Sequence, residues 1–466
     1  MRKFIVFAVI IAVLASMAAT VYAAPPPDGP PGLKRAIEVQ EAHTDSLVAI
    51  PGVVGTAVGL QTDGEPVVKI YTESPGVVGL PKKLDGVPVL VQVTGKIVAL
   101  GKPQNPGAKG GGGNKAPEAD DQDVTTNAGD LVDILITGFD KNGCGDPPTN
   151  FTFSATSPTY GGSLDYYNGS MACNGKGYLS AQVQYTPKSG NDYFDSFTFT
   201  ISDGEKASNI ATVSITVGSP PSPPRYHRPA YIGTSSGSEQ LINIDGQSFC
   251  TVGTLGVRLT DGTNVYALSN NHVYALEGIG AIDDRILQPG RVDMTDMACG
   301  STDEINEAVI GNLAGYVPII FSTTANNKVD AAVASTMVEM VGTSTPLETG
   351  YGTPSSTIAP AEVGMRVQKH GRTTSLTKGR VTGINATILV EYDSGIARFE
   401  GQIEVFGRGF SAGGDSGSLI VTTNGLNPVA LLFAGGGFYT FGNPIGDVLS
   451  ELSNELGGTL SIDGGP

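Results

Sequence analysis

Tryptophan is absent from this 466-residue sequence, and histidine and cysteine occur only four times each. Charged residues make up 16% of the chain, and their balance gives a net charge of −17. A nucleic-acid-binding protein normally needs a basic face, so this composition argues against nucleic acid as a partner. It also disfavours docking on anionic lipid. No Cys-x-x-Cys or His-x-x-x-His spacing occurs, and we therefore expect neither a metal site nor a cofactor.

Long hydrophobic runs are missing after the first residues of the chain. Residues 1–23 have the features of a signal peptide: Arg2 and Lys3 precede an apolar run over 4–14, and Ala23 ends a small-residue cleavage site. No later run is long enough to span a bilayer. We expect an exported protein, secreted or periplasmic, with no stable membrane anchor once the signal peptide has been cleaved.

The loop 413–418 reads Gly-Gly-Asp-Ser-Gly-Ser and lies between two apolar, β-rich runs. Its glycines leave Ser416 sterically open to a substrate and let successive backbone N–H groups turn toward one point. This arrangement suits a nucleophile whose oxyanion hole is built from its own loop. A serine hydroxyl is a weak nucleophile, however, and it needs a general base and a group that orients the base.

His272 is the candidate base among the four histidines. It follows a strand-like run over 265–268, in the context Asn-Asn-His-Val. The other three lie in less suitable places: His43 in a helix pattern, His227 in a Pro-rich linker and His370 at a strand end.

Asp330 is the candidate acid that orients the base. It lies in the apolar stretch 329–333, where a bare buried carboxylate would be costly. A hydrogen bond to an imidazole is one way to offset that cost. Each motif is weak alone, since Asp-Ser-Gly is a common turn sequence. The three together, each in its own local context, indicate a catalytic triad.

The chain order His272, Asp330, Ser416 matches that of chymotrypsin-type peptidases. The sequence resembles the trypsin-like serine peptidase superfamily over about residues 230–456. Three short stretches carry the resemblance. Asn-Asn-His-Val at 270–273 resembles the base motif of the HtrA-like branch, Asp-Ala-Ala-Val at 330–333 resembles the acid motif, and Gly-Asp-Ser-Gly at 414–417 resembles the nucleophile motif. With Gln-Pro-Gly at 288–290 and Gly-Arg-Thr-Thr at 371–374, it looks most like bacterial secreted relatives of the plant Narrow Leaf trypsin-like proteins.

The resemblance implies a role for each residue. Ser416 attacks a peptide carbonyl, and His272 takes its proton and later gives it to the leaving amine. Asp330 holds the histidine tautomer and stabilises the imidazolium. The backbone N–H groups of Gly414 and Ser416 form the oxyanion hole. The chain has no Arg-Ile-Val-Gly-Gly-like activation site, which puts in doubt an activation by a new N-terminus that pairs with Asp415.

We expect a mainly β protein, in which a double β-barrel trypsin-like peptidase domain is preceded by a β-sandwich and a small α+β N-terminal domain. Abundant glycine and proline favour such turn-rich β structure. The predicted segments are a signal peptide (1–23), the α+β domain (33–100), a Gly-rich linker (101–117), the β-sandwich (118–217), a Pro-rich linker (218–229) and the peptidase domain (230–456).

The α+β segment 33–100 has two open interpretations. It is either a pro-segment or inhibitory module that masks the peptidase cleft, or an accessory domain for packing or dimerisation. The second is favoured, because a position before the catalytic domain is weak support for the first. In the sandwich, the stretch 193–203 resembles bacterial cadherin-like or immunoglobulin-like surface repeats. Such modules act as spacers or adhesive units, so an extracellular or cell-surface protein partner is conceivable here.

The four cysteines are expected to form two disulfides. Pairing within each predicted domain closes short loops and needs no contact between domains. We therefore predict Cys144–Cys173 and Cys250–Cys299. Free thiols are the alternative, and they are less common outside the cytosol.

The predicted specificity pocket is apolar. Phe410, six residues before Ser416, matches the pocket-floor position of the superfamily, and Ala434, Gly435 and Gly436 resemble the strand that pairs with substrate. An unpaired buried cation is expensive, so a preference for apolar or small residues over Lys or Arg is expected.

Two functions remain open at this stage. The first is an exported serine endopeptidase that cleaves protein or peptide substrates through an acyl-enzyme. The second is a secreted adhesive or scaffolding protein that carries an inactive peptidase fold.

Overall fold

The computed structural model describes most of the chain outside the two termini and the linkers. The described residues are 29–100, 116–119, 122–126, 130–140, 142–144, 150–158, 161–166, 168–173, 177–188, 193–217, 227–244, 247–294, 299, 302–407 and 409–465. The predicted signal peptide, and almost all of both predicted linkers, lie outside these residues. Among the described helices, none is long and apolar enough to cross a membrane.

The first half of the peptidase region is a barrel. Its strands are β16 (Ser235–Ser238), β19 (Gly253–Thr254), β20 (Val257–Thr260), β21 (Val265–Ser269), β22 (Arg285–Leu287), β23 (Val309–Tyr316), β24 (Ala332–Thr336) and β31 (Ser461–Ile462). They pair in the order β19-β16-β22-β23-β24-β21-β20-β31. Because β19 leads almost directly into β20, the two ends of this sheet meet and the sheet closes on itself. A separate hairpin joins β17 (Ile242–Ile244) to β18 (Gln247–Phe249).

The second half is another barrel. It consists of β25 (Arg366–Gly371), β26 (Ser375–Glu391), β27 (Ile396–Phe406), β28 (Leu419–Thr422), β29 (Pro428–Gly436) and β30 (Tyr439–Pro444). The order is β25-β28-β29-β30-β27-β26, and a further pairing of β25 with β26 closes the ring. Helix α4 (Ile445–Leu456) follows β30 and buries Ile445, Val448 and Leu452 in the core of the first barrel, so it ties the two halves together.

Four short helical segments complete the described part of the first half. They are α2 (Asn271–Tyr274), α3 (Thr302–Ala308) and two single 3₁₀ turns at Leu276–Gly278 and Arg291–Asp293. Helix α2 begins two residues after β21 ends, so His272 lies at the mouth of the barrel rather than on a strand.

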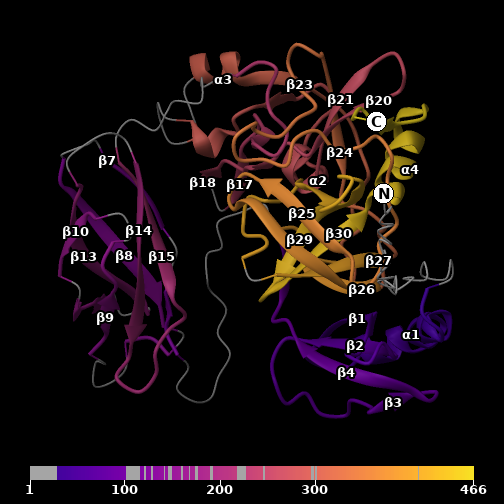
Figure 1. Ribbon diagram of the computed structural model, residues 1–466, viewed down its shortest axis with the longest axis horizontal. Coiled ribbons are helices and arrows are strands. Elements are labelled where there is room, and N and C mark those ends of the chain that lie inside the picture. Colours follow the sequence, from indigo (N-terminus) through magenta and orange to yellow (C-terminus); the bar gives the residue numbers. More distant parts are fainter. Residues whose placement is uncertain are drawn as a thin grey trace, which may run out of the picture.

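The N-terminal segment continues the sheet of the second barrel. It contains α1 (Leu33–Val48), β1 (Val53–Leu60), β2 (Pro66–Thr72), β3 (Lys83–Leu84), β4 (Val87–Val93) and β5 (Ile97–Ala99). β1 pairs antiparallel with β26, so that the barrel sheet runs on through β1, β2, β4 and β3 (Figure 1). Gly55 permits this close approach, because a Cβ there would lie 2.4 Å from the Thr387 carbonyl oxygen.

The middle segment forms a β-sandwich. One sheet holds β6 (Glu118–Ala119), β8 (Val132–Phe139), β10 (Ser163–Asp165), β12 (Ala172–Cys173) and β13 (Tyr178–Thr186). The other holds β7 (Gln122–Thr126), β9 (Thr152–Ala155), β11 (Asn168–Ser170), β14 (Tyr193–Ser202) and β15 (Ala211–Val217). Alternate residues of both sheets, among them Ile134, Val183 and Phe199, build the core between them.

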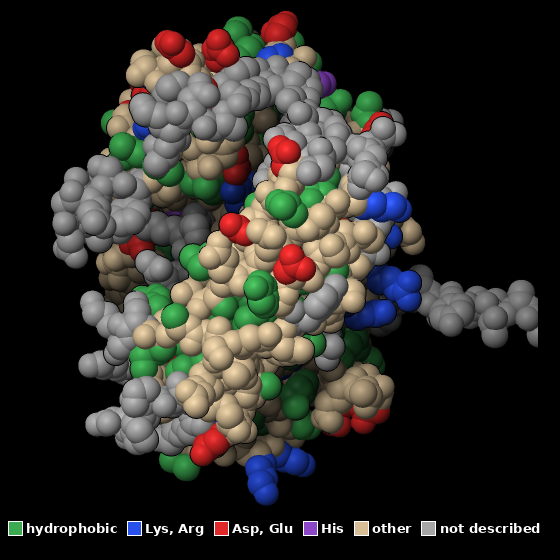
Figure 2. Space-filling view, turned by 90° about the vertical axis from the view of Figure 1, so that its left-hand side faces the viewer, with side chains coloured by type: hydrophobic (Ala, Val, Ile, Leu, Met, Phe, Trp, Pro, Cys, Tyr) green, Lys and Arg blue, Asp and Glu red, His purple; other side chains and the backbone are tan. Residues whose placement is uncertain are grey.

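The predicted disulfides are confirmed. Cys144 bonds Cys173 within the sandwich, and Cys250 bonds Cys299 within the first barrel region. Disulfides persist in oxidising compartments, so both bonds fit a location outside the cytosol. The face drawn in Figure 2 carries charged side chains scattered over its coloured surface, with no broad basic patch there.

Candidate active site

The imidazole of His272 lies against the carboxylate of Asp330. β21, which ends just before α2, pairs with β24, and Asp330 lies two residues before β24 begins, so the register of these strands brings the two side chains together. His272 Nδ1 and Asp330 Oδ2 are 2.5 Å apart, and the His272 backbone N–H donates to Oδ1 at 3.2 Å. Both residues are buried. This pair can hold one tautomer of the imidazole, with Nε2 free to accept a proton.

Asp330 is fixed by three further groups. The Tyr392 hydroxyl donates to Asp330 Oδ2 at 2.8 Å, the Asn270 side-chain amide donates to the Asp330 carbonyl, and Asn443 Oδ1 accepts from its backbone N–H. Burial, and then the nearby Asp330 charge, raise the pKa of Tyr392 well above its usual value, so its hydroxyl stays protonated as a donor. The sequence did not predict this contact of Tyr392, because the residue stood only at the end of a predicted strand.

His272 Nε2 is buried and has no hydrogen-bond partner among the described residues. A buried polar atom without a partner carries a cost of about 1–3 kcal/mol. Such exceptions need an explanation, and a catalytic role is one of them.

Ser416 sits in the turn before β28 and is buried at the junction of the two barrels. Its carbonyl oxygen accepts from the Thr254 backbone N–H at 2.7 Å, so the loop is anchored on the first barrel. A Cβ on Gly253 would meet both the side chain of Val273, next to His272, and the Ser416 carbonyl oxygen. The loop that carries Ser416 and the helix that carries His272 therefore face the same point of β19.

The Ser416 hydroxyl itself is not hydrogen-bonded to His272 in this structure. It donates to the Phe433 carbonyl oxygen at 3.4 Å. The structure thus brings His272 and Asp330 into contact and places Ser416 across the junction, with its hydroxyl turned to β29.

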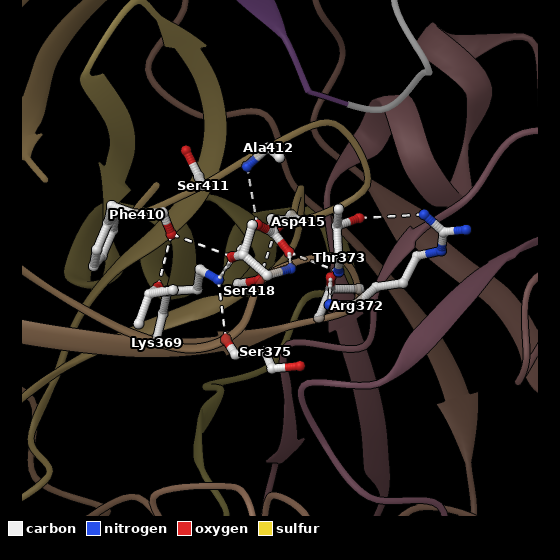
Figure 3. Close-up of polar contacts among 12 residues, drawn as sticks. Lys369, Arg372, Thr373, Ser375, Phe410, Ser411, Ala412, Asp415 and Ser418 are labelled. Atoms are coloured by element: carbon white, nitrogen blue, oxygen red, sulfur yellow. Dashed lines mark hydrogen bonds and ion pairs between the residues drawn. The ribbon is translucent and has the colours of Figure 1, made fainter. Parts of the chain in front are cut away.

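Asp415, next to Ser416 in the loop, accepts hydrogen bonds from several donors (Figure 3). The carboxylate accepts from the backbone N–H groups of Ala412, Thr373 and Thr374, and from the Thr374 hydroxyl. Lys369 Nζ lies 3.3 Å away, and both side chains are fully buried. Burial lowers the pKa of Lys369, while Asp415 opposes that shift. Because Asp415 already has a cationic partner, it has no need of a new N-terminus, as the missing activation motif suggested.

Gly414 presents its backbone N–H to a peptide carbonyl. It donates to the carbonyl oxygen of Leu100 at 2.5 Å. Gly414 has a φ of 93°, a left-handed conformation that a side chain would strain. The N–H predicted for an oxyanion hole therefore already binds a carbonyl oxygen.

The predicted pocket residues Ala434, Gly435, Gly436 and Phe410 lie next to residues 94–100. β5 pairs antiparallel with β29, with Ala99 opposite Ala434 and Val98 opposite Gly435. A Cβ on Gly436 would come within 3 Å of the Thr94 and Lys96 carbonyl oxygens. Phe410 is buried in an apolar cluster that also contains Leu100.

Arg372, in contrast, has a structural partner. Its guanidinium forms two hydrogen bonds with the Asp293 carboxylate, at 2.7 and 2.5 Å. A bidentate pair of this kind fixes the guanidinium.

The described residues contain no group of three or more His, Cys, Asp or Glu side chains that could hold a metal ion.

Comparisons with known proteins found similar families and structures. A family model described as "Bacterial Ig domain" matches residues 114–216. The structure is similar to a glutamic-acid-specific serine protease (18% identity, TM-score 0.33, 50% of this chain and 100% of that one). It is also similar to protease A of Thermobifida fusca (18%, 0.33, 50% and 98%) and to a chymotrypsin of Cellulomonas bogoriensis (17%, 0.29, 50% and 97%). A search of curated proteins found no match.

The strand pairing of the chain gives two closed β-barrels, the fold class of chymotrypsin-like proteins, together with a β-sandwich that matches the bacterial Ig domain.

Proposed function

We propose that this chain is an exported serine endopeptidase whose catalytic residues are Ser416, His272 and Asp330. One observation supports the proposal above the others. The imidazole of His272 is hydrogen-bonded to a buried carboxylate through Nδ1, and its Nε2 is buried without a partner at the junction where Ser416 lies. A general base must be oriented on one side and unoccupied on the other, and this imidazole meets both conditions.

The mechanism needs one movement, a rotation of the Ser416 side chain away from the Phe433 carbonyl toward His272 Nε2. The hydrogen bond that would be given up is long, at 3.4 Å, and hence weak. His272 then accepts the hydroxyl proton as Ser416 attacks, and it returns that proton to the leaving amine. Water hydrolyses the acyl-enzyme by the same route. Asp330, itself held by Tyr392, stabilises the imidazolium in both steps.

The backbone N–H groups of Gly414 and Ser416 would stabilise the tetrahedral intermediate. Removing one such donor costs about 3 kcal/mol in comparable sites. Phe410, Ala434, Gly435 and Gly436 would form the pocket for the residue on the amino side of the cleaved bond. An apolar pocket of this kind would favour apolar over charged residues there.

The two disulfides and the sequence of residues 1–23 support a secreted or periplasmic location. The sandwich is the candidate surface for an extracellular or cell-surface protein partner. Within the superfamily, the motifs favour the bacterial secreted relatives of the plant Narrow Leaf trypsin-like proteins.

A peptide library tests the proposal. The full chain is expected to hydrolyse peptides after apolar or small residues, and Ser416→Ala should remove this hydrolysis. Ser411→Ala is the matched control, because it deletes a hydroxyl five residues away that bonds only to Thr440 among the described residues. A folded protein that cuts no peptide, and whose Ser416 does not react with a fluorophosphonate probe, would favour the scaffolding alternative. Equal hydrolysis by Ser416→Ala would rule out this nucleophile.

A further inference from the structure

Strand β5 of the N-terminal segment lies against β29, the strand whose Phe433 carbonyl oxygen accepts from the Ser416 hydroxyl. On one edge it pairs antiparallel with β29, and on the other it pairs parallel with β26, where Ile97 lies opposite Val390. An extended segment that adds itself to the edge of a sheet is a common way for proteins to bind a peptide. Here the bound peptide is part of the same chain.

Leu100 follows β5 directly and contacts the candidate site with both its main chain and its side chain. Its backbone N–H donates to the Phe433 carbonyl oxygen at 3.1 Å, and its carbonyl oxygen accepts from Gly414 at 2.5 Å. The side chain is buried, with 7% exposed, in the same apolar cluster as Phe410. A Cβ on Gly435 would lie 3.1 Å from Leu100 Cδ1, so Gly435 leaves room for the leucine side chain that a larger residue would crowd.

The Ser416 hydroxyl and the Leu100 backbone meet at one atom. Both the hydroxyl and the Leu100 N–H donate to the carbonyl oxygen of Phe433, at 3.4 and 3.1 Å. The carbonyl group of Leu100 is therefore held by an oxyanion donor on one side, with the nucleophile close to the same residue. This is the position that the carbonyl of a peptide substrate has to occupy.

We propose that residues 29–100 are an inhibitory module of this peptidase, and that the peptide bond after Leu100 is the site at which the chain cuts itself. Leucine is then the residue that the specificity pocket prefers. This inference rests on the proposed peptidase function. It also decides between the two interpretations of the N-terminal segment in favour of the inhibitory module.

The self-processing step needs only water as a co-reactant. Ser416 Oγ forms a bond to the Leu100 carbonyl carbon, and His272 takes the hydroxyl proton. The C–N bond that follows Leu100 breaks, and His272 returns the proton to the departing amine. Water then attacks the ester, one of its protons passes through His272 back to Ser416 Oγ, and Leu100 is left with a carboxylate.

The cut alone would not release the module. β1 stays paired with β26 along the barrel edge, and Lys69 of β2 forms a buried ion pair with Glu404 of β27 at 2.7 Å. At the surface, Lys96 pairs with Glu391. With these contacts intact, the new C-terminus at Leu100 remains in the pocket as a bound product, and full activity requires removal of the module.

Two variants at Leu100 test the inference in the full chain. Leu100→Asp places a carboxylate in the apolar pocket, whereas Leu100→Met keeps the volume. The products are sized and sequenced to locate any cut, and a fluorophosphonate probe measures how open the site is. For the parent chain and Leu100→Met, we expect a fragment that ends at residue 100, and Ser416→Ala should not produce it. Leu100→Asp should not be cut there, and its Ser416 should react with the probe about tenfold to a hundredfold faster than that of the uncut parent, as expected from the loss of one buried leucine.

The outcomes separate this inference from the proposed function. A protein whose Ser416 reacts with the probe, but which is never cut after Leu100 and reacts no faster as Leu100→Asp, would overturn the inference and leave the peptidase proposal standing. If Ser416 reacts in none of these chains and no cut appears, both proposals fail. A cut after Leu100 that persists in Ser416→Ala would assign the cleavage to another protease and also overturn the inference.

Discussion

Replacing His272 by alanine is expected to lower kcat for peptide hydrolysis about a million-fold, as removal of the base does in enzymes whose triad acts as a unit. The physical reason is that no other described group can take the Ser416 proton. Lys369, the nearest buried cation to the loop, is committed to Asp415. The measurement is single-turnover hydrolysis of a leucine-containing peptide, with thermal melting to show that the variant is folded.

Two companion variants frame this result. His227→Ala changes a histidine that bonds to the Pro229 carbonyl, away from the triad, and it should leave the rate unchanged. Tyr392→Phe keeps the triad but deletes one hydrogen bond to the Asp330 carboxylate, and we expect a loss of about tenfold to a hundredfold, the usual worth of a bond to a charged group. A His272→Ala protein that keeps more than a tenth of the parent rate would remove His272 from the mechanism.

Replacing Lys69 by methionine is expected to destabilise the protein by about 3–5 kcal/mol, because it leaves a buried charge without its partner. Glu404 is fully buried, and its carboxylate also accepts from the hydroxyls of Tyr71 and Thr382. These neutral donors cannot replace the ammonium group. The free energy of unfolding is measured by chemical denaturation of the full chain, with a spectroscopic probe that reports on the second barrel.

A second substitution identifies the cause. Lys69→Met combined with Glu404→Gln removes the orphaned charge, so it should recover most of the lost stability. The amide oxygen still accepts from one of the two hydroxyls, and the amide N–H can donate to the other. Arg35→Met breaks only an exposed ion pair with Glu38 on the same module, and it should cost no more than about 1 kcal/mol. Equal losses from Lys69→Met and Arg35→Met would mean that the buried pair does not hold the module to the barrel.

Much of the candidate site could be predicted from the sequence because its chemistry depends on short local contexts. The glycines around Ser416, the apolar run around Asp330 and the order of the three residues can all be found in the sequence itself. The two disulfides followed from the same kind of local reasoning. Tyr392 could not be found in this way, because its contact with Asp330 depends on the path of β26 through the second barrel.

The sequence left an inhibitory module as one interpretation of the N-terminal segment, but it could not show which residues of that segment contact the candidate site. β26 is 17 residues long, and its later part pairs with β1. The two strands are far apart in the sequence, so no local pattern predicts this contact. β5 has only three residues and adjoins a glycine-rich stretch, so its sequence indicates the end of a domain. Only its register against β29 reveals that Leu100 reaches the candidate oxyanion hole.

The central claim is that Ser416 is a nucleophile activated by His272. The most direct measurement is mass spectrometry of the folded protein after reaction with a fluorophosphonate, on both the parent chain and Leu100→Asp. The account predicts one phosphonate adduct, on the peptide that contains Ser416, and none when His272 is alanine. An adduct on another serine, or no adduct on either folded chain, would contradict it.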